Sequence, residues 1–185
     1  MKKSIKINQI LLTMMIAIMS FGCGSNDDQD MDPDKTSSEY FMKAKVNGTL
    51  VEFKTETLLS GGIGSSIQGV YDLSLSGGRR SSDQSGLAES ITIVLRETSP
   101  ITQKNYSGLT PFEYGFKGVL LGYAFDIEEK IYTTDINGPN VNLEITEIKE
   151  THIKGKFSGV VKDFLSGETK TITEGTFFVK RVADF

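Results

Sequence analysis

The sequence has one cysteine, one histidine and no tryptophan among its 185 residues. A single cysteine excludes an internal disulfide and a metal site built from several cysteines, and a single histidine excludes a two-histidine metal site. The 24 acidic residues outnumber the 20 basic ones, so the net charge is −4. This balance argues against nucleic acid as a partner, because phosphates require clustered lysine and arginine. The length predicts one folded domain with appendages.

Long apolar runs are also scarce, and the clearest one lies near the N-terminus. Three basic residues, Lys2, Lys3 and Lys6, precede the apolar run Ile10–Phe21. A basic start followed by a short apolar run is typical of a secretory signal peptide. As a helix the run would reach about 18 Å, whereas the core of a bilayer is about 30 Å thick. It is therefore not expected to be a permanent transmembrane anchor.

The apolar run is followed by Gly22-Cys23, which places a small residue directly before the only cysteine. This pair resembles the lipobox of bacterial lipoproteins, although Ser20 stands where leucine is commoner. The resemblance implies cleavage after Gly22 and a diacylglycerol on the Cys23 thiol. Two or more acyl chains anchor a protein stably, and one does not. The alternative is a soluble secreted protein that is cut nearby and in which Cys23 has no role.

An acidic segment follows the cysteine. The stretch Gly24–Glu39 carries six acidic residues and one lysine, and it shows no apolar periodicity. It cannot bury an apolar face, so we expect a flexible, solvated tether. The acidic run also resembles the surface-export signal of Bacteroidetes lipoproteins; the alternative is a spacer kept soluble by its charge. The predicted organisation is a signal peptide at 1–22, a disordered tether at 23–39 and a β domain at 40–185.

From residue 40 onward, apolar residues recur at every second position, which is typical of β-strands. Asn47-Gly48 is a strong hairpin signal, because both central residues of a type I′ turn have positive φ. The pattern predicts strands at 42–46, 49–55, 67–75, 91–95, 121–125, 131–133, 141–145, 153–161 and 169–181, a polar loop at 77–86 and an irregular region at 100–118. We expect an all-β fold, either a single antiparallel β-sandwich or a partly closed β-barrel of about nine short strands. The last strand is expected inside the sheet rather than at an edge.

Several of these segments together resemble a family of Bacteroidetes outer-membrane lipoproteins of unknown function. The matching segments are Ala44–Gly48, Val141–Glu147, Ile153–Gly159 and Thr171–Phe177, and they consist mainly of glycine, phenylalanine and β-branched residues. The resemblance covers most of residues 1–182 and implies the same order of signal, acidic tether and all-β domain. It implies a location in the outer membrane, and it brings no activity and no catalytic residues.

Two groups of polar residues are candidates for chemistry. His152 lies in a polar stretch that enters a predicted strand, but no Gly-x-Ser-x-Gly motif accompanies it, so we expect an exposed turn histidine rather than a general base. The neighbouring carboxylates Glu128 and Glu129 are expected to be solvated in a turn. The sequence therefore predicts no catalytic residues.

Oxygen-bearing side chains are frequent between residues 135 and 144. Calcium takes six to eight oxygen ligands, and the segment opens like a calcium loop before Pro139 interrupts the pattern. Because asparagine, glycine and aspartate also dominate ordinary turns, we expect a plain turn and no metal. The residues concerned are Asp135, Asn137, Asn140, Asn142 and Glu144.

Aromatic and basic residues provide two further candidates. Arg79-Arg80 can grip a carboxylate or a phosphate, but the surrounding serine and glycine favour a mobile loop with solvated charges. Aromatic rings in the irregular region can stack on sugars, although a hydrophobic cover over one end of the domain is the favoured interpretation. These rings belong to Tyr106, Phe112, Tyr114 and Phe116.

Together these features predict a lipid-anchored, non-catalytic binding or interaction protein of the outer membrane, facing the cell surface. It is expected to be a palmitate-bearing lipoprotein that meets the membrane through its N-terminal lipid and binds a glycan or an envelope protein. No cofactor and no nucleic acid are expected. The alternatives are a carrier that holds a small ligand in the interior or mouth of a barrel and, third, a hydrolase. A binder should expose an apolar patch, a carrier should contain a cavity and a hydrolase should bury clustered titratable groups.

Overall fold

The computed structural model describes residues 40–54, 58–65, 69–82, 87–113, 115–125, 130–136, 138 and 141–182. Glu39–Phe185 form one compact unit. The predicted signal peptide, its cleavage site at Gly22 and Cys23, and the acidic tether all lie outside the described residues. Within the described ranges, no helix is both long and apolar enough to span a bilayer.

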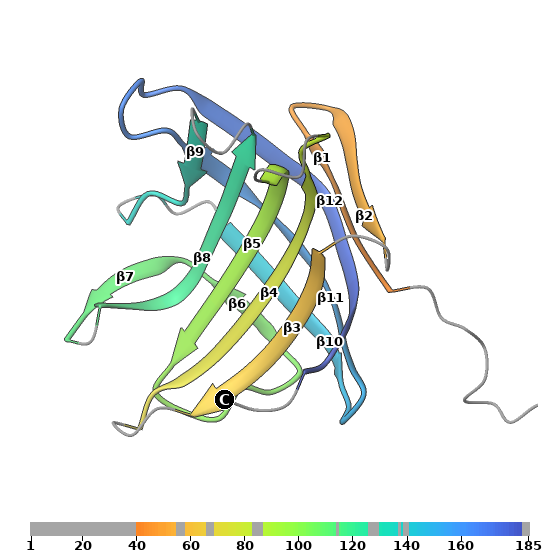
Figure 1. The fold of residues 1–185 in the computed structure, drawn as a ribbon. Coiled ribbons are helices and arrows are strands. Elements are labelled where there is room, and N and C mark those ends of the chain that lie inside the picture. The colour runs from red at the N-terminus through yellow and green to blue at the C-terminus, as the bar shows by residue number, and fades with distance from the viewer. Residues whose placement is uncertain are drawn as a thin grey trace, which may run out of the picture. The chain divides into compact units, whose positions relative to one another are not determined.

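The described residues of the domain form twelve strands, and neighbouring strands pair antiparallel (Figure 1). Nine of them follow one another in the order β2-β1-β12-β11-β9-β8-β5-β4-β3, while β10 pairs with β11 and β6, and β7 pairs with β8. The strands are β1 Phe41–Val46, β2 Thr49–Lys54, β3 Leu58–Ser65, β4 Tyr71–Arg80, β5 Leu87–Glu97, β6 Asn105–Ser107, β7 Leu109–Phe112, β8 Gly115–Phe125, β9 Lys130–Thr133, β10 Val141–Ile148, β11 His152–Lys162 and β12 Thr169–Lys180.

The sheet curls until its two ends approach each other. β2 and β3 are the ends of the nine-strand path, and β3 reaches the chain beyond β12 through a bridge between Gly61 and Arg181. The amide of Val182 also donates a hydrogen bond to the Gly61 carbonyl at 2.8 Å. The result is a nearly closed antiparallel barrel, which confirms the all-β prediction and decides for the barrel over the sandwich.

Alternate residues of each strand face the interior, as the period of two predicts. In β5, Ile91, Ile93 and Leu95 are fully buried, whereas Thr92 and Val94 between them are only partly buried. Full burial of one such side chain contributes about 1.5–3 kcal/mol. Residues from nearly every strand fill the core in the same way, among them Met42, Phe53, Leu73, Leu75, Leu121, Leu143, Ile145, Ile153, Ile172, Phe177 and Val179.

Two glycines make room for large rings in this core. A Cβ at Gly155 would lie 2.5 Å from Cζ of Phe177, and a Cβ at Gly175 would lie 2.7 Å from Cγ of Phe157. Each ring therefore packs over a glycine of the neighbouring strand. The two rings lie 6.3 Å apart, centroid to centroid.

The predicted turn at Asn47-Gly48 and the predicted place of the last strand are confirmed. Asn47 and Gly48 connect β1 to β2 with φ values of 48° and 85°, as a type I′ turn requires. β12 lies between β1 and β11, inside the sheet.

The prediction of a polar loop at 77–86 is wrong for residues 77–80, because these residues belong to β4, which ends at Arg80. Gly77 pairs with Ile91, and a Cβ on it would lie 2.7 Å from the ring of Phe53. Gly77 is thus needed because two packed strands approach closely there. Composition alone does not distinguish such a glycine from one in a loop.

Three strands were not predicted. β3 consists largely of glycine and serine, which have low β propensity, and it is held by eight register pairs with β4. β6 and β7 are short and fall in the region predicted to be irregular, which also contains the start of β8. The predicted strand at 67–75 begins at Tyr71 in the structure, and residues 66–68 lie outside the described ranges.

Candidate ligand-binding site at the barrel mouth

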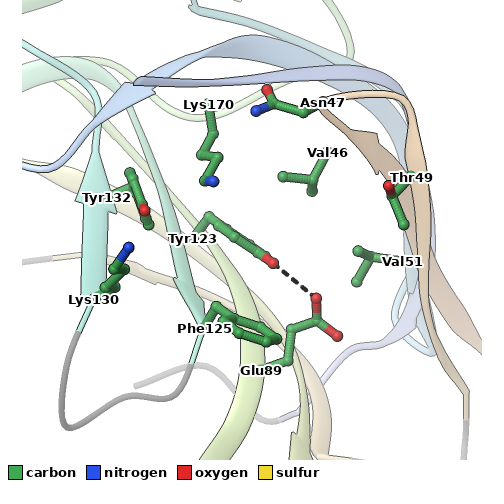
Figure 2. Close-up of a pocket in the computed structure, with 10 residues that line it drawn as sticks. All are labelled: Val46, Asn47, Thr49, Val51, Glu89, Tyr123, Phe125, Lys130, Tyr132 and Lys170. Carbon is green, nitrogen blue, oxygen red and sulfur yellow. Dashed lines mark hydrogen bonds between the residues drawn. The ribbon is translucent and has the colours of Figure 1, made fainter. Parts of the chain in front are cut away.

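A pocket of about 390 Å³ opens at one end of the barrel, where the β1–β2 hairpin meets the C-terminal end of β8 and the N-terminal ends of β5, β9 and β12 (Figure 2). Its walls combine apolar and aromatic side chains with a few charged ones, as is usual for small-molecule sites. The pocket is lined by Val46, Asn47, Thr49, Val51, Glu89, Tyr123, Phe125, Lys130, Tyr132 and Lys170.

The aromatic wall follows from strand register. Tyr123 and Phe125 are two positions apart on β8 and therefore share a face. Tyr132 on β9 is the register partner of Tyr123, and the centroids of the two rings lie 6.0 Å apart. Tyr123 and Tyr132 are buried, whereas Phe125 is 55% exposed and stands at the rim.

A buried carboxylate lies in the wall of the pocket. Glu89 on β5 is only 8% exposed. The Tyr123 hydroxyl donates a hydrogen bond to its Oε1 at 2.8 Å, and Nη2 of Arg79 lies 2.7 Å from its Oε2. Both oxygens thus have partners, which compensates the cost of burying the charge. Burial, and secondly the hydrogen bond to Glu89, raise the pKa of the Tyr123 hydroxyl well above its ordinary value.

Two lysines share a second carboxylate at the mouth. Nζ of Lys170 lies 2.7 Å from Oε1 of Glu168, and Nζ of Lys130 lies 3.3 Å from Oε2 of the same residue. The hydrogen bond from Lys170, followed by the nearby Tyr132 hydroxyl, lowers the pKa of Glu168 to about 2. Glu168 in turn raises the pKa of Lys170. Lys170 also lies over the Tyr132 ring, with Nζ 5.3 Å from the centroid.

The Tyr132 hydroxyl is buried and makes no hydrogen bond within the described part of the chain. It is close enough to Glu168 to affect the pKa of that carboxyl, but the geometry does not complete a hydrogen bond. Burial is the main reason why the pKa of Tyr132 is raised. A buried hydroxyl without a partner is costly, so a group that accepts a hydrogen bond from it would be stabilising.

A second hollow, of about 730 Å³, lies on the outer face of the barrel across β6, β10, β11, β12 and β1. It presents amide, hydroxyl and charged groups, including a pair in which Nζ of Lys156 lies 3.3 Å from Oε2 of Glu144. Its one aromatic residue, Phe157, is buried. The hollow therefore offers hydrogen bonds but no exposed ring on which a sugar can stack.

The prediction of His152 as an exposed turn residue is wrong. The residue begins β11, and 15% of its side chain is exposed. Its Nε2 lies 2.8 Å from Oε1 of Glu147, and its ring meets the ring of Phe178 edge-on at 4.9 Å. The side chain is thus held in an outer aromatic cluster away from the mouth.

Arg79 does not lie in a loop either, although 49% of its side chain is exposed. It lies in β4, where it pairs with Glu89 and stacks 5.8 Å over the Phe53 ring. Arg80, at the end of β4, is exposed. The prediction thus fails for Arg79 because its pairing depends on the register of β4 with β5.

The aromatic residues of the region predicted to be irregular lie in different surroundings. Tyr106 belongs to the core, where its hydroxyl donates to the Thr102 carbonyl at 2.9 Å. Phe112 is half-buried, and Phe116 lies under the guanidinium of Arg96 at 5.0 Å. Tyr106 is thus a buried core residue of β6 rather than an exposed ring on which a sugar can stack. Tyr114 lies outside the described residues.

The oxygen-bearing side chains predicted between residues 135 and 144 make separate contacts. Asn142 is exposed on β10, as part of the outer hollow, and Glu144 pairs with Lys156. Within the described ranges no group of three or more histidine, cysteine, aspartate or glutamate side chains is placed to hold a metal ion. Asp135 is half-buried, and its backbone carbonyl accepts a hydrogen bond from the Gly138 amide at 2.9 Å. Asn137, Asn140, Glu128 and Glu129 lie outside the described ranges.

The residues of the mouth were not singled out by sequence reasoning. The alternation of Tyr123 and Phe125 was a usable signal, since it placed both rings on one face of a predicted strand. Glu89 and Lys170 carry no such signal, because their neighbours come from strands distant in sequence.

Comparison with protein-family models, with curated proteins and with solved structures finds no match for this chain.

Proposed function

We propose that the chain is a lipid-anchored outer-membrane protein whose barrel mouth binds a small molecule without converting it. The anchor rests on the sequence, where Gly22-Cys23 follows a short apolar run and precedes an acidic segment. The binding role rests on one observation: a pocket of about 390 Å³ in which polar groups converge on aromatic walls. This combination is the usual form of a small-molecule site.

A binding role suits the charged groups better than catalysis does. The carboxylate of Glu89 is committed to Tyr123 and Arg79, and that of Glu168 is committed to two lysines. A general base needs a free lone pair within reach of a substrate proton. The core side chains occupy the barrel interior, so the mouth is the natural place for a carried ligand.

The anchor is tested by metabolic labelling of the full chain with radioactive palmitate in a bacterial host. We expect the wild-type chain to take up label and to partition with the outer membrane, and the Cys23→Ala variant to lose both. Label that persists in Cys23→Ala, or a wild-type chain that takes up none, would contradict the anchor.

The binding role is tested by thermal shift of the full chain in detergent against organic acids, fatty acids, monosaccharides and nucleosides. A ligand at 100 times its dissociation constant adds about 2.7 kcal/mol of stability. Phe125→Ala should weaken binding, and Phe164→Ala is the matched control, because the two rings are 55% and 62% exposed and neither supports the core. A flat response to the whole panel, or equal weakening by both variants, would exclude the mouth.

A protein partner is the second candidate, because the β11–β12 turn presents two apolar side chains. Phe164 and Leu165 are 62% and 98% exposed. Asp163 fixes the turn, since it accepts hydrogen bonds from the Leu165 amide at 2.8 Å and from the Ser166 hydroxyl at 2.7 Å. A partner recovered from envelope extracts by the wild-type chain should be lost when both apolar residues become serine. Equal recovery by the double variant would remove this candidate.

A further inference from the structure

The walls of the mouth pocket favour a flat, largely apolar ligand. Two buried tyrosine rings and the exposed ring of Phe125 face the space together with Val46 and Val51 (Figure 2). A volume of about 390 Å³ lies toward the small end of the usual range for ligand sites, roughly 300–1,000 Å³. The space therefore suits a single ring with a short substituent.

The charges at the mouth are unequal. Arg79 and Glu89 neutralise each other, whereas Lys130 and Lys170 share the single carboxylate of Glu168. Among the described residues of this site, one positive charge is left over, although the whole chain carries a net charge of −4. The neighbouring residues 126–129 lie outside the described ranges and are not included in this sum.

The surplus charge lies beside a group that can donate a hydrogen bond. Lys170 stands over the ring of Tyr132, and the Tyr132 hydroxyl is buried without a hydrogen-bond partner in the described structure. An anionic group at this point would accept from the hydroxyl and complete the charge balance with the lysines.

We infer that the mouth pocket selects a small ring compound that carries one carboxylate, with its ring between Tyr123, Phe125 and Tyr132 and its carboxylate toward Lys170, Lys130 and the Tyr132 hydroxyl. This inference rests on the proposed binding function and adds the class of ligand to it.

The test uses the full chain in detergent and two probes of nearly equal shape, phenylacetate and phenylacetamide, with binding measured by calorimetry. We expect phenylacetate to bind at least about tenfold more tightly than the neutral amide, because a charge-assisted hydrogen bond is roughly twice as strong as a neutral one. Raising the salt concentration should reduce this preference.

Three variants locate the carboxylate. Lys170→Gln and Tyr132→Phe should each weaken phenylacetate binding by about five- to tenfold and leave phenylacetamide nearly unchanged. Lys180→Gln, an exposed lysine at the far end of β12, is the matched control and should change neither. Thermal unfolding of each variant shows whether the fold is intact. If the Lys170→Gln variant does not fold, the Lys130→Gln variant is used in its place, because it retains the ion pair between Lys170 and Glu168.

The outcomes separate this inference from the function on which it rests. Equal affinity for acid and amide, or binding of other compounds but of neither probe, overturns the ligand class and leaves the mouth as a binding site. A preference for the acid that survives both Lys170→Gln and Tyr132→Phe overturns the placement of the carboxylate. Absence of binding by any compound overturns the proposed function as well.

Discussion

Tyr123 and Tyr132 face each other across two paired strands, but their hydroxyl groups have different surroundings. The Tyr123 hydroxyl donates to Glu89, whereas the Tyr132 hydroxyl is buried without a partner in the described structure. The two residues therefore form a matched pair in which the same substitution should have different consequences.

Tyr123→Phe is expected to destabilise the protein by about 1–2 kcal/mol, because the buried Glu89 carboxylate loses a hydrogen-bond donor. Tyr132→Phe should be neutral or slightly stabilising, since it removes an unsatisfied polar group. Urea unfolding of the two variants measures the difference. Equal losses for both would mean that the Tyr123–Glu89 hydrogen bond does not contribute.

Gly155→Ala is expected to cost about 2–4 kcal/mol in unfolding free energy, because the new methyl group would clash with the backbone carbonyl of Glu144 and would lie 2.5 Å from the ring of Phe177. Gly122→Ala is the control. Its new methyl group would meet its nearest atom at an ordinary contact distance of 3.8 Å, so its effect should be small. Similar stability of the two variants would show that the Glu144 backbone and the ring of Phe177 both move aside easily.

At the residue scale, little of the candidate site could be predicted from the sequence. The alternating rings of Tyr123 and Phe125 were visible in a predicted strand, but Glu89 precedes the strand predicted at 91–95. Lys170 meets these residues only through the pairing of β11 with β12 and β9. The site is a product of register between distant strands, and one sequence does not determine that register.

At the scale of elements, ion pairs near strand ends tie neighbouring strands together. Glu168 lies just before β12 and pairs with Lys130 of β9. Glu147 of β10 contacts Lys149, His152 and Lys154. Hydrogen bonds from Lys149 and then from His152 lower the pKa of Glu147 to about 2, and the hydrogen bond from Lys170 is the main cause of the similarly lowered pKa of Glu168.

These lowered pKa values predict a loss of stability in acid. A carboxyl whose pKa is lower in the folded than in the unfolded chain stabilises the fold above its unfolded pKa, here 4.5. That contribution is lost as the pH falls from about 4.5 through about 2. Glu168→Gln should therefore flatten the fall of Tm between pH 5 and pH 2. The difference from wild type should shrink in 1 M salt, because both carboxylates are partly exposed and their pairs are screened. Identical pH profiles would contradict this role.

Elements were predicted well where local patterns carry the information. The β1–β2 hairpin follows from Asn47-Gly48, and β5, β10 and β11 follow from alternating apolar residues. β3 was missed because its sequence, LLSGGIGS, contains three glycines and two serines. Those small residues serve packing, since a Cβ at Gly61 would lie 2.6 Å from Val179. The low β propensity of this segment is outweighed by its packing against strands that the sequence does not identify as its neighbours.

At the scale of the whole molecule, the barrel is closed by few backbone contacts between β3 and the end of the chain. Among the described residues the isolated Gly61–Arg181 bridge and the Val182 amide make the backbone contacts at this seam. A chain truncated after Lys180 should lose about 1–3 kcal/mol of stability and show faster hydrogen exchange in β3. A chain truncated after Val182 keeps both contacts and is the control. Equal exchange in the two truncated chains would place the weak point elsewhere.

The all-β class and the approximate number of strands could be predicted, because a period of two is a local property of the sequence. The choice between sandwich and barrel could not be made. It depends on the pairing of β1 with β12, which brings Phe41 opposite Phe178.

The same pairing has a consequence for how the protein is made. β1 has only β2 as a partner until the last strand of the chain exists. At about 5–20 residues per second, synthesis from residue 41 to residue 178 takes roughly 7–27 s. During that time the future barrel is an open sheet with bare edges and an uncovered apolar face. This interval is when a chaperone, a protease or an export machinery meets the chain unfolded, and its length is set by the distance in sequence between the first strand and the last.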